Sequence, residues 1–135
     1  MMAIRPVTEM VDAAKAELDN ISPAEAQRRV TDEGALIVDI RDVRELQRDG
    51  AMPGANHSPR GMLEFWVDPE SPYAKDLFQE DREFIFCCAG GMRSALAAKT
   101  LQDMGLARIS HIESGFGGWK ADGLEVVDYD TFRGR

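Results

Sequence analysis

One stretch near the middle of the chain, residues 84–94, constrains the fold more than any other. It begins with the apolar run Phe-Ile-Phe-Cys, continues through Cys-Ala-Gly-Gly, and ends in Met-Arg-Ser, where a helical pattern opens. This order predicts a buried strand, a tight loop and a helix N-terminus. The backbone N–H groups of such a loop point inward and the helix dipole adds positive potential, so the loop suits an anion. A cysteine at its mouth is expected to be favoured as the nucleophilic thiolate.

The chain has two cysteines, Cys87 and Cys88, and they are adjacent. Neighbouring Cα atoms lie about 3.8 Å apart, which is below the usual minimum of about 4.4 Å for a disulfide. We therefore expect both thiols to be free. Side chains alternate along a strand, so Cys87 should point into the core if Cys88 points into the loop. This alternation favours Cys88 as the nucleophile and Cys87 as a core residue.

Composition and charge disfavour several classes of function. The 135 residues suffice for one domain with its own core, and 44% hydrophobic and 30% charged residues are typical of a globular protein. A formal net charge of −8 disfavours nucleic acid or an anionic membrane as a partner. Charged residues interrupt the N-terminal segment, so we expect no signal peptide, and no stretch reaches the roughly 18 apolar residues of a membrane span. These features predict a cytoplasmic protein.

Helix and strand patterns alternate along the chain. Helices are expected over 8–19, 22–32, 41–47, 61–67 and 94–104 and in a last turn ending near 123, and strands over 35–40, 55–58, 84–87 and 109–112. Ser22 caps the second helix and Gly34 ends it. The alternation predicts an α/β fold with helices on both faces of the sheet. The ligand site should lie beyond the C-terminal ends of the strands, where Cys88 falls.

Four short segments stand out in order along the chain. They are Leu36-Ile-Val-Asp39-Ile-Arg41 with Glu45, Gly50-Ala51-Met-Pro53-Gly54-Ala55, Cys88-Ala-Gly-Gly91-Met-Arg93-Ser94 and Gly115-Phe-Gly-Gly118-Trp119. Together they resemble the signatures of the rhodanese family of sulfurtransferases. The third segment is similar to that family's six-residue active-site loop, Cys-x-x-Gly-x-Arg. Each motif alone is weak, but four motifs in the right order make the resemblance specific.

The resemblance implies a rhodanese-like fold, with a five-stranded, mostly parallel sheet and helices on both faces. It divides the chain into an N-terminal helical extension, 1–21, a rhodanese-like domain, 22–125, and a polar C-terminal tail, 126–135. Residues 20–21 are interpreted as a break between two helices, and the segment from Leu124 onward is expected to fray.

The resemblance also implies sulfur transfer through a persulfide on Cys88. By the family pattern, this catalytic cysteine takes a sulfane sulfur from a small anionic donor such as thiosulfate. It passes the sulfur to a thiol, to a cyanide-like acceptor or to a protein acceptor. No cofactor or metal is expected, and the histidines and cysteines lack the spacing of a zinc site. The sequence departs from the family at Ala51, where a histidine is usual, and at Ala89, where many thiosulfate-using members carry a basic residue.

The loop after the central strand supplies the expected binding groups. Substrate contacts are assigned to loop amides and side chains and to one further arginine, namely Ala89, Gly90, Gly91, Met92, Arg93, Ser94 and Arg60. Arg93 is expected either to add positive charge near the sulfur or to bind loop carbonyls, and Arg60 to bind an anionic donor. Asp39 and Arg41 are interpreted as structural, with Arg41 able to pair with Glu45, four residues on.

Two other functions stay open on the sequence alone. Counted from Cys87, the loop to Arg93 encloses five residues, which is the spacing of tyrosine-phosphatase-type loops. A cysteine-dependent phosphatase or arsenate reductase that uses this loop is therefore the first alternative. The second is a non-catalytic, regulatory module that binds a partner protein through the N-terminal helix. The presence of the cysteine and of the full loop argues against this second alternative.

Overall fold

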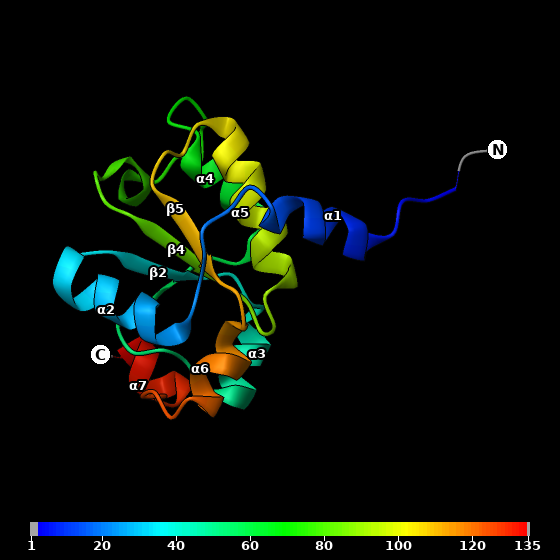
Figure 1. The fold of residues 1–135 in the computed structure, drawn as a ribbon. Helices are drawn as coiled ribbons and strands as arrows, with labels where there is room; N and C mark the ends of the chain where they lie inside the picture. Colours follow the sequence, from blue (N-terminus) through cyan, green and yellow to red (C-terminus); the bar gives the residue numbers. More distant parts are fainter. Residues whose placement is uncertain (1–2, 135) are drawn as a thin grey trace.

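The computed structural model describes residues 3–134, which fold around a five-stranded sheet (Figure 1). The strands are β1 (Asn20–Ile21), β2 (Leu36–Asp39), β3 (Asn56–His57), β4 (Phe84–Cys87) and β5 (Ile109–Ile112). Their order across the sheet is β1-β5-β4-β2-β3, and each pair of neighbours is parallel. The predicted α/β fold is confirmed, and the parallel arrangement extends to every pairing in this sheet. The carboxyl ends of the strands therefore lie at one edge, where β4 runs into the loop that carries Cys88.

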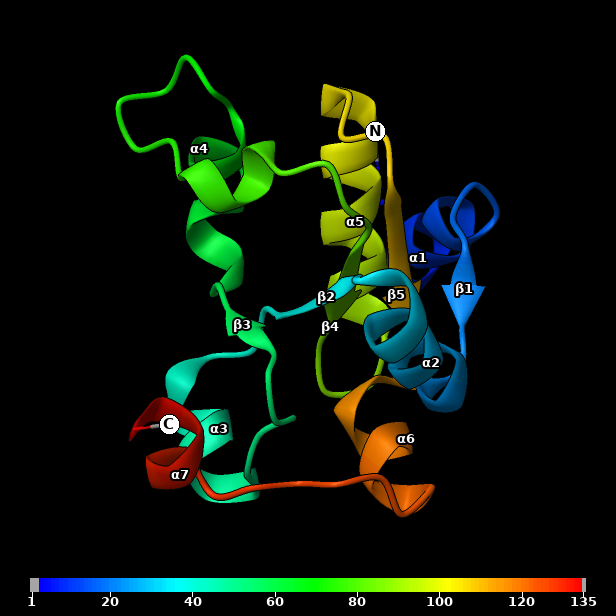
Figure 2. The ribbon, with the colours of Figure 1, turned by 90° about the vertical axis from the view of Figure 1, so that its left-hand side faces the viewer.

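Helices cover both faces of the sheet, as predicted (Figures 1 and 2). They are α1 (Val7–Lys15), α2 (Pro23–Glu33), α3 (Val43–Asp49), α4 (Leu63–Val67), α5 (Met92–Met104), α6 (Gly115–Ala121) and α7 (Tyr129–Gly134), with 3₁₀ turns η1 (Arg60–Met62) and η2 (Asp76–Gln79). Helices α4 and α5 pack on one face, and α1 packs against the outer side of α5. Helices α2 and α6 pack on the other face.

Strand β4 contributes side chains to two hydrophobic cores, one on each face of the sheet. Phe84 and Phe86 pack in the core formed with α4 and α5, whereas Ile85 and Cys87 pack in the core formed with α2 and α6. All four residues are buried, because alternate side chains of a strand point to opposite faces. This is why the strand is a continuous apolar run, which is typical of a parallel strand between two helical layers.

The structure differs from the expectation in a segment near each end of the chain. Residues 20–21, interpreted as a break, form β1 and pair with His111 and Ile112 of β5. The segment from Leu124 onward, which was expected to fray, contains regular structure within the described residues, because Val127 forms an antiparallel bridge with Ala51 and α7 follows it. Both segments are ordered by partners that are distant in the sequence, which a local pattern does not reveal.

A buried ion pair ties the end of β2 to its neighbours. Arg41 is 1% exposed, and its Nη2 donates to Oδ2 of Asp39 at 2.8 Å. The same nitrogen donates to the carbonyl O of Gly50 at 2.9 Å, and the guanidinium carbon lies 3.9 Å from the centroid of the Phe116 ring. Arg41 is therefore a structural residue, as expected, although its partner is Asp39 rather than a residue of the following helix.

Replacing Arg41 with leucine should lower the free energy of unfolding by about 3–5 kcal/mol, because the buried Asp39 carboxylate loses its partner. Chemical denaturation at neutral pH measures this loss. The matched control is Arg44→Leu, whose ion pair with Asp42 is exposed to water and screened by it. The control should unfold close to the wild-type midpoint. Equal losses in the two variants would contradict a stabilising role for the buried pair.

A second polar group, His111 of β5, is buried on the face of the sheet that α5 covers. Its Nδ1 lies 2.9 Å from Oγ of Ser94, and its Nε2 lies 2.6 Å from Oδ1 of Asn20. The Asn20 amide nitrogen donates to the carbonyl oxygens of Lys15 and Leu18, so its Oδ1 is the acceptor. Nε2 of His111 therefore carries the hydrogen, and Nδ1 accepts a hydrogen bond from the Ser94 hydroxyl.

This buried histidine makes the stability of the fold depend on pH. Burial lowers the pKa of His111 from 6.5 to about 4, with Lys15 acting in the same direction and Glu113 and Asp19 opposing it. The unfolded chain binds this proton more readily than the folded chain, so stability is lost as the pH falls from 6.5 toward 4. From pH 7.5 to pH 5 the histidine should lower the free energy of unfolding by about 2 kcal/mol.

Denaturant titrations of the wild type and of His111→Gln at both pH values measure this effect. Glutamine does not titrate, so the variant should keep only the losses that arise from other groups. If the variant loses as much stability on acidification as the wild type does, His111 is not the source of the pH dependence.

Candidate active site

The loop that follows β4 holds the sulfur of Cys88 against two backbone amides. The amide N of Gly91 lies 3.1 Å from Sγ and that of Ser94 lies 3.3 Å from it, and both donate to the sulfur. Ser94 lies in the first turn of α5, so the helix dipole adds positive potential at the same point. Cys88 is 1% exposed, yet it lines a pocket. This arrangement stabilises an anionic sulfur beside a space that a small molecule can enter.

The start of α6 holds the loop in this shape. The amide N of Phe116 donates to the carbonyl O of Cys88 at 2.7 Å, and that of Gly117 donates to the carbonyl O of Ala89 at 3.0 Å. Gly115 has a φ of 67°, and a Cβ atom there would lie 2.5 Å from the carbonyl O of Ala89, so glycine permits the close approach. The repeated glycines of this segment are the sequence signal for the contact, which was not predicted.

The Ser94 side chain extends the site into the core. Its hydroxyl donates to Nδ1 of His111, so a lone pair of Oγ faces Sγ of Cys88, 3.6 Å away. In the thiol form, the S–H group of Cys88 donates to this oxygen. Ser94 thus contacts the sulfur twice, through its amide and through a hydroxyl whose orientation is set by the buried histidine.

Cys87 lies on the opposite face of the sheet from Cys88. It is fully buried in the core formed with α2 and α6, and both cysteines are free thiols. Burial and the nearby Asp39 raise the pKa of the Cys87 thiol well above its ordinary range. Cys87 is therefore a core residue, as strand alternation predicts, and it is poorly suited to act as a thiolate nucleophile.

Arg93 is bound by Glu45 of α3. Its Nη1 and Nη2 donate to the two oxygens of that carboxylate at 2.9 and 2.8 Å, and the guanidinium lowers the pKa of the carboxyl. Glu45 is engaged here and not with Arg41. The hydrogen bonds of Arg93 thus go to an acidic side chain and not to the loop carbonyls, and the ion pair offsets the positive charge that was expected near the sulfur.

The pocket at Cys88 has mostly apolar walls and a volume of about 400 Å³. Its lining residues are Val7, Cys88, Gly90, Met92, Arg93 and Leu96. Gly90 and Met92 therefore lie beside the cysteine, whereas the carbonyl of Ala89 is turned toward α6. Val7 was not predicted as a site residue, because a helix that precedes the recognisable motifs gives no local sign of where its end will lie.

Arg60 lies in a neighbouring pocket, between α1 and α5. That pocket is lined by Arg5, Met10, Ala13, Ala14, Glu17, Arg60, Leu96, Lys99 and Thr100. The Nη1 of Arg60 lies 2.8 Å from Oε1 of Glu64, four residues on. The structure therefore does not bring Arg60 into the pocket that contains the cysteine.

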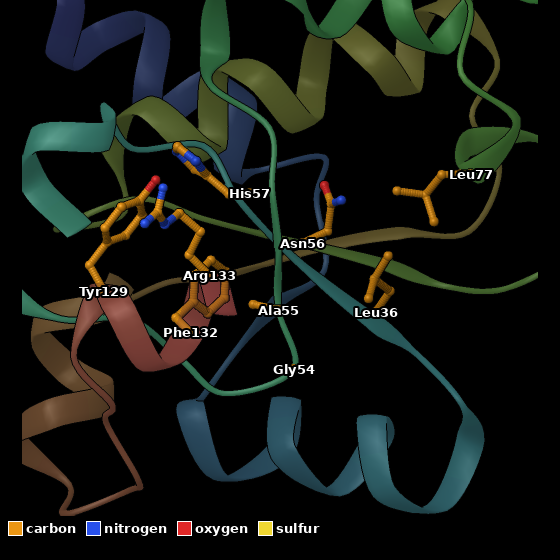
Figure 3. Close-up of a pocket in the computed structure, with 9 residues that line it drawn as sticks. All are labelled: Leu36, Gly54, Ala55, Asn56, His57, Leu77, Tyr129, Phe132 and Arg133. Carbon is orange, nitrogen blue, oxygen red and sulfur yellow. The ribbon is translucent and has the colours of Figure 1, made fainter. Parts of the chain in front are cut away.

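A larger pocket, of about 470 Å³, lies at the β3 edge of the sheet beside α7 (Figure 3). It is lined by Leu36, Gly54, Ala55, Asn56, His57, Leu77, Tyr129, Phe132 and Arg133. His57, Tyr129 and Arg133 lie at one end of it, and the two leucines lie at the other (Figure 3). These lining residues include no cysteine. The loop at Cys88 is therefore the better candidate for covalent chemistry.

Histidine, cysteine and acidic side chains are the residue types that could bind a metal ion. Within residues 3–134, no group of three or more His, Cys, Asp or Glu side chains is placed to hold a metal ion. His111 lies beneath α5, whereas His57 ends β3, where its Nε2 lies 2.7 Å from the carbonyl O of Arg41.

Over the same described residues, no helix combines the length and the apolar character needed to cross a bilayer.

Comparison with known proteins agrees with the four sequence motifs. The Rhodanese-like domain family matches residues 22–122. The thiosulfate sulfurtransferase GlpE of Actinobacillus pleuropneumoniae serotype 5b is 32% identical over 108 residues, which cover 78% of this chain and 90% of that protein. The family match over residues 22–122 includes both the loop at Cys88 and helix α6, which supports that loop.

Solved structures show the same fold. A protein of unknown function from Rhodopseudomonas palustris CGA009, described as a possible tyrosine phosphatase, is 50% identical, with a TM-score of 0.87 over 93% of this chain and 97% of that chain. The polysulfide-sulfur transferase of Wolinella succinogenes is 30% identical, with a TM-score of 0.67 over 89% of this chain and 85% of that chain. Because the family match spans most of the sequence and the fold agrees with it, the protein belongs to the rhodanese-like family.

Proposed function

We propose that this protein is a sulfurtransferase that carries a sulfane sulfur as a persulfide on Cys88. The observation that carries the proposal is the pair of hydrogen bonds to Sγ from the amides of Gly91 and Ser94, at the N-terminus of α5. Sulfur transfer needs a thiolate first and a persulfide anion second, and the same donors stabilise both. Family membership and the likeness to a thiosulfate sulfurtransferase support this activity.

The proposed reaction has two halves. In the first, the Cys88 thiolate attacks the outer sulfur of the donor, a new S–S bond forms, and the rest of the donor leaves with the electron pair of the broken bond. In the second, a thiolate or cyanide attacks the terminal sulfur of the persulfide, and the Cys88 thiolate leaves. Two free thiols suit this chemistry in a reducing compartment such as the cytoplasm.

A cysteine-dependent phosphatase or arsenate reductase is the competing function, raised by the 50% identical protein described as a possible tyrosine phosphatase. A phosphoryl group in such a loop needs an arginine that clamps its oxygens. Here both terminal nitrogens of Arg93 are bound by Glu45. The five-residue spacing also requires Cys87, which is buried on the other face of the sheet with its thiol pKa raised. These contacts favour sulfur transfer.

Mass spectrometry of the protein after exposure to thiosulfate or inorganic polysulfide tests the assignment of the nucleophile. The wild type and Cys87→Ala should each gain about 32 Da, the mass of one sulfur atom, and Cys88→Ala should gain none, because Cys88 alone lies in the amide-lined loop. Addition of cyanide should remove the sulfur as thiocyanate. Thiocyanate formation in steady state should follow the same pattern.

Two results would count against the proposal. Uptake of sulfur by Cys88→Ala, together with its loss in Cys87→Ala, would show that the nucleophile is the other cysteine. Absence of sulfur uptake from either donor, together with cleavage of p-nitrophenyl phosphate, would favour the phosphatase.

The amide of Gly91 provides a second test, because this residue has a φ of 98° and a Cβ atom there would overlap the carbonyl O of Glu113. In Gly91→Ala the loop must shift, and the sulfur loses a donor that should be worth about 100-fold in the rate of persulfide formation. The control is Gly61→Ala, which has open space around its Cβ position and should react at the wild-type rate. A Gly91→Ala rate within twofold of the wild type would show that the loop amides are not needed.

A further inference from the structure

The pocket at Cys88 is bounded by side chains from two parts of the chain. Met92 and Leu96 come from α5, which begins within the active-site loop, and Val7 is the first residue of α1. The volume of this pocket, about 400 Å³, lies within the range of small-molecule sites. Val7 is 53% exposed and Met92 is 43% exposed, so two large apolar side chains face solvent at the mouth of the site.

The mouth of the pocket at Cys88 carries little positive charge for a site that is expected to bind a small inorganic anion. Among the described residues that line the pocket, Arg93 alone carries charge, and Glu45 binds its guanidinium with two hydrogen bonds. Arg60 lies in the neighbouring pocket and pairs with Glu64. Thiosulfate would therefore lack a free cation from these two arginines, whereas an apolar group would contact carbon on several sides.

Helix α1 is positioned to act as one wall of the site. Its Val11 and Ala14 are buried against Ala95 of α5 and so hold the helix on the domain. The family match begins at residue 22, so α1 is an addition to the rhodanese-like region. Apolar side chains left exposed together at the mouth of a pocket are typical of a ligand-binding surface. Val7 is therefore placed to contact a substrate and not to fill the core.

We infer that the donor for this site is an organic sulfane-sulfur compound, in which an apolar group belongs to the part of the donor that leaves when the terminal sulfur is transferred, and that α1 contacts this group through Val7. The inference rests on the proposed sulfur transfer by Cys88 and adds the class of donor. For a thiosulfonate, the Cys88 thiolate attacks the terminal sulfur, a new S–S bond forms, and the bond from that sulfur to the sulfonyl sulfur breaks. The sulfinate leaves with the electron pair, and the persulfide anion stays on Cys88.

A pair of alkanethiosulfonates tests this inference, because methane- and butanethiosulfonate release sulfinates of similar reactivity and differ in apolar length. The two compounds differ by three methylenes, and each fully buried methylene is worth about a fourfold change. Because Val7 is half exposed and burial at this mouth is partial, kcat/KM with cyanide as the acceptor should be about tenfold higher for the butane compound. Val7→Ser should lower the ratio of the two values about threefold by removing part of the wall. The matched control is Val30→Ser on α2, where the valine is 38% exposed and lies outside the pocket lining; this variant should keep the wild-type ratio.

The outcomes separate the two proposals. If both compounds load sulfur onto Cys88 with equal kcat/KM, or if Val7→Ser and Val30→Ser have the same ratio, sulfur transfer stands and the inference of an apolar donor is wrong. If neither thiosulfonate nor thiosulfate nor polysulfide forms a persulfide on Cys88, the proposed function fails and the inference falls with it. A tenfold preference that Val7→Ser reduces and Val30→Ser keeps supports both.

Discussion

Two backbone hydrogen bonds from the start of α6 hold the loop at Cys88 in its shape. They run from the amides of Phe116 and Gly117 to the carbonyl oxygens of Cys88 and Ala89. With those carbonyls engaged, the amides of Gly91 and Ser94 face the sulfur. The bonds form because β4 and β5 are parallel neighbours, so the loops that leave them lie side by side at the carboxyl edge of the sheet. The central strands thus place α6 where it contacts the loop at Cys88.

Dipoles surround the sulfur of Cys88, while a carboxylate balances the guanidinium that lines its pocket. Amides and the N-terminus of α5 act on the sulfur itself, whereas Arg93 is held by Glu45. A thiolate and a persulfide anion need local stabilisation of one atom, which two amides supply. A phosphoryl group spreads charge over several oxygens and needs a wider clamp. For this reason the contacts at Cys88 are consistent with the proposed sulfur transfer, which does not need a charged pocket beside the sulfur.

The sequence predicted the strand, loop and helix around Cys88 because each depends on local patterns, namely an apolar run, glycines and a helix start. The opposite burial of Cys87 followed from strand alternation alone. Strand β1 was missed because its two residues are ordered by β5, some 90 positions away in the sequence. The ion pair of Arg93 with Glu45 and the position of Val7 at the pocket were missed for the same reason, since each depends on how separate helices are placed in the fold.

A crystal structure of the protein after brief exposure to a sulfane-sulfur donor would show which cysteine carries the transferred sulfur. We expect density for one additional sulfur on Sγ of Cys88, within hydrogen-bonding distance of the loop amides, and an unmodified Cys87. Additional sulfur on Cys87 beside an unmodified Cys88 would contradict the proposal that Cys88 carries the sulfur.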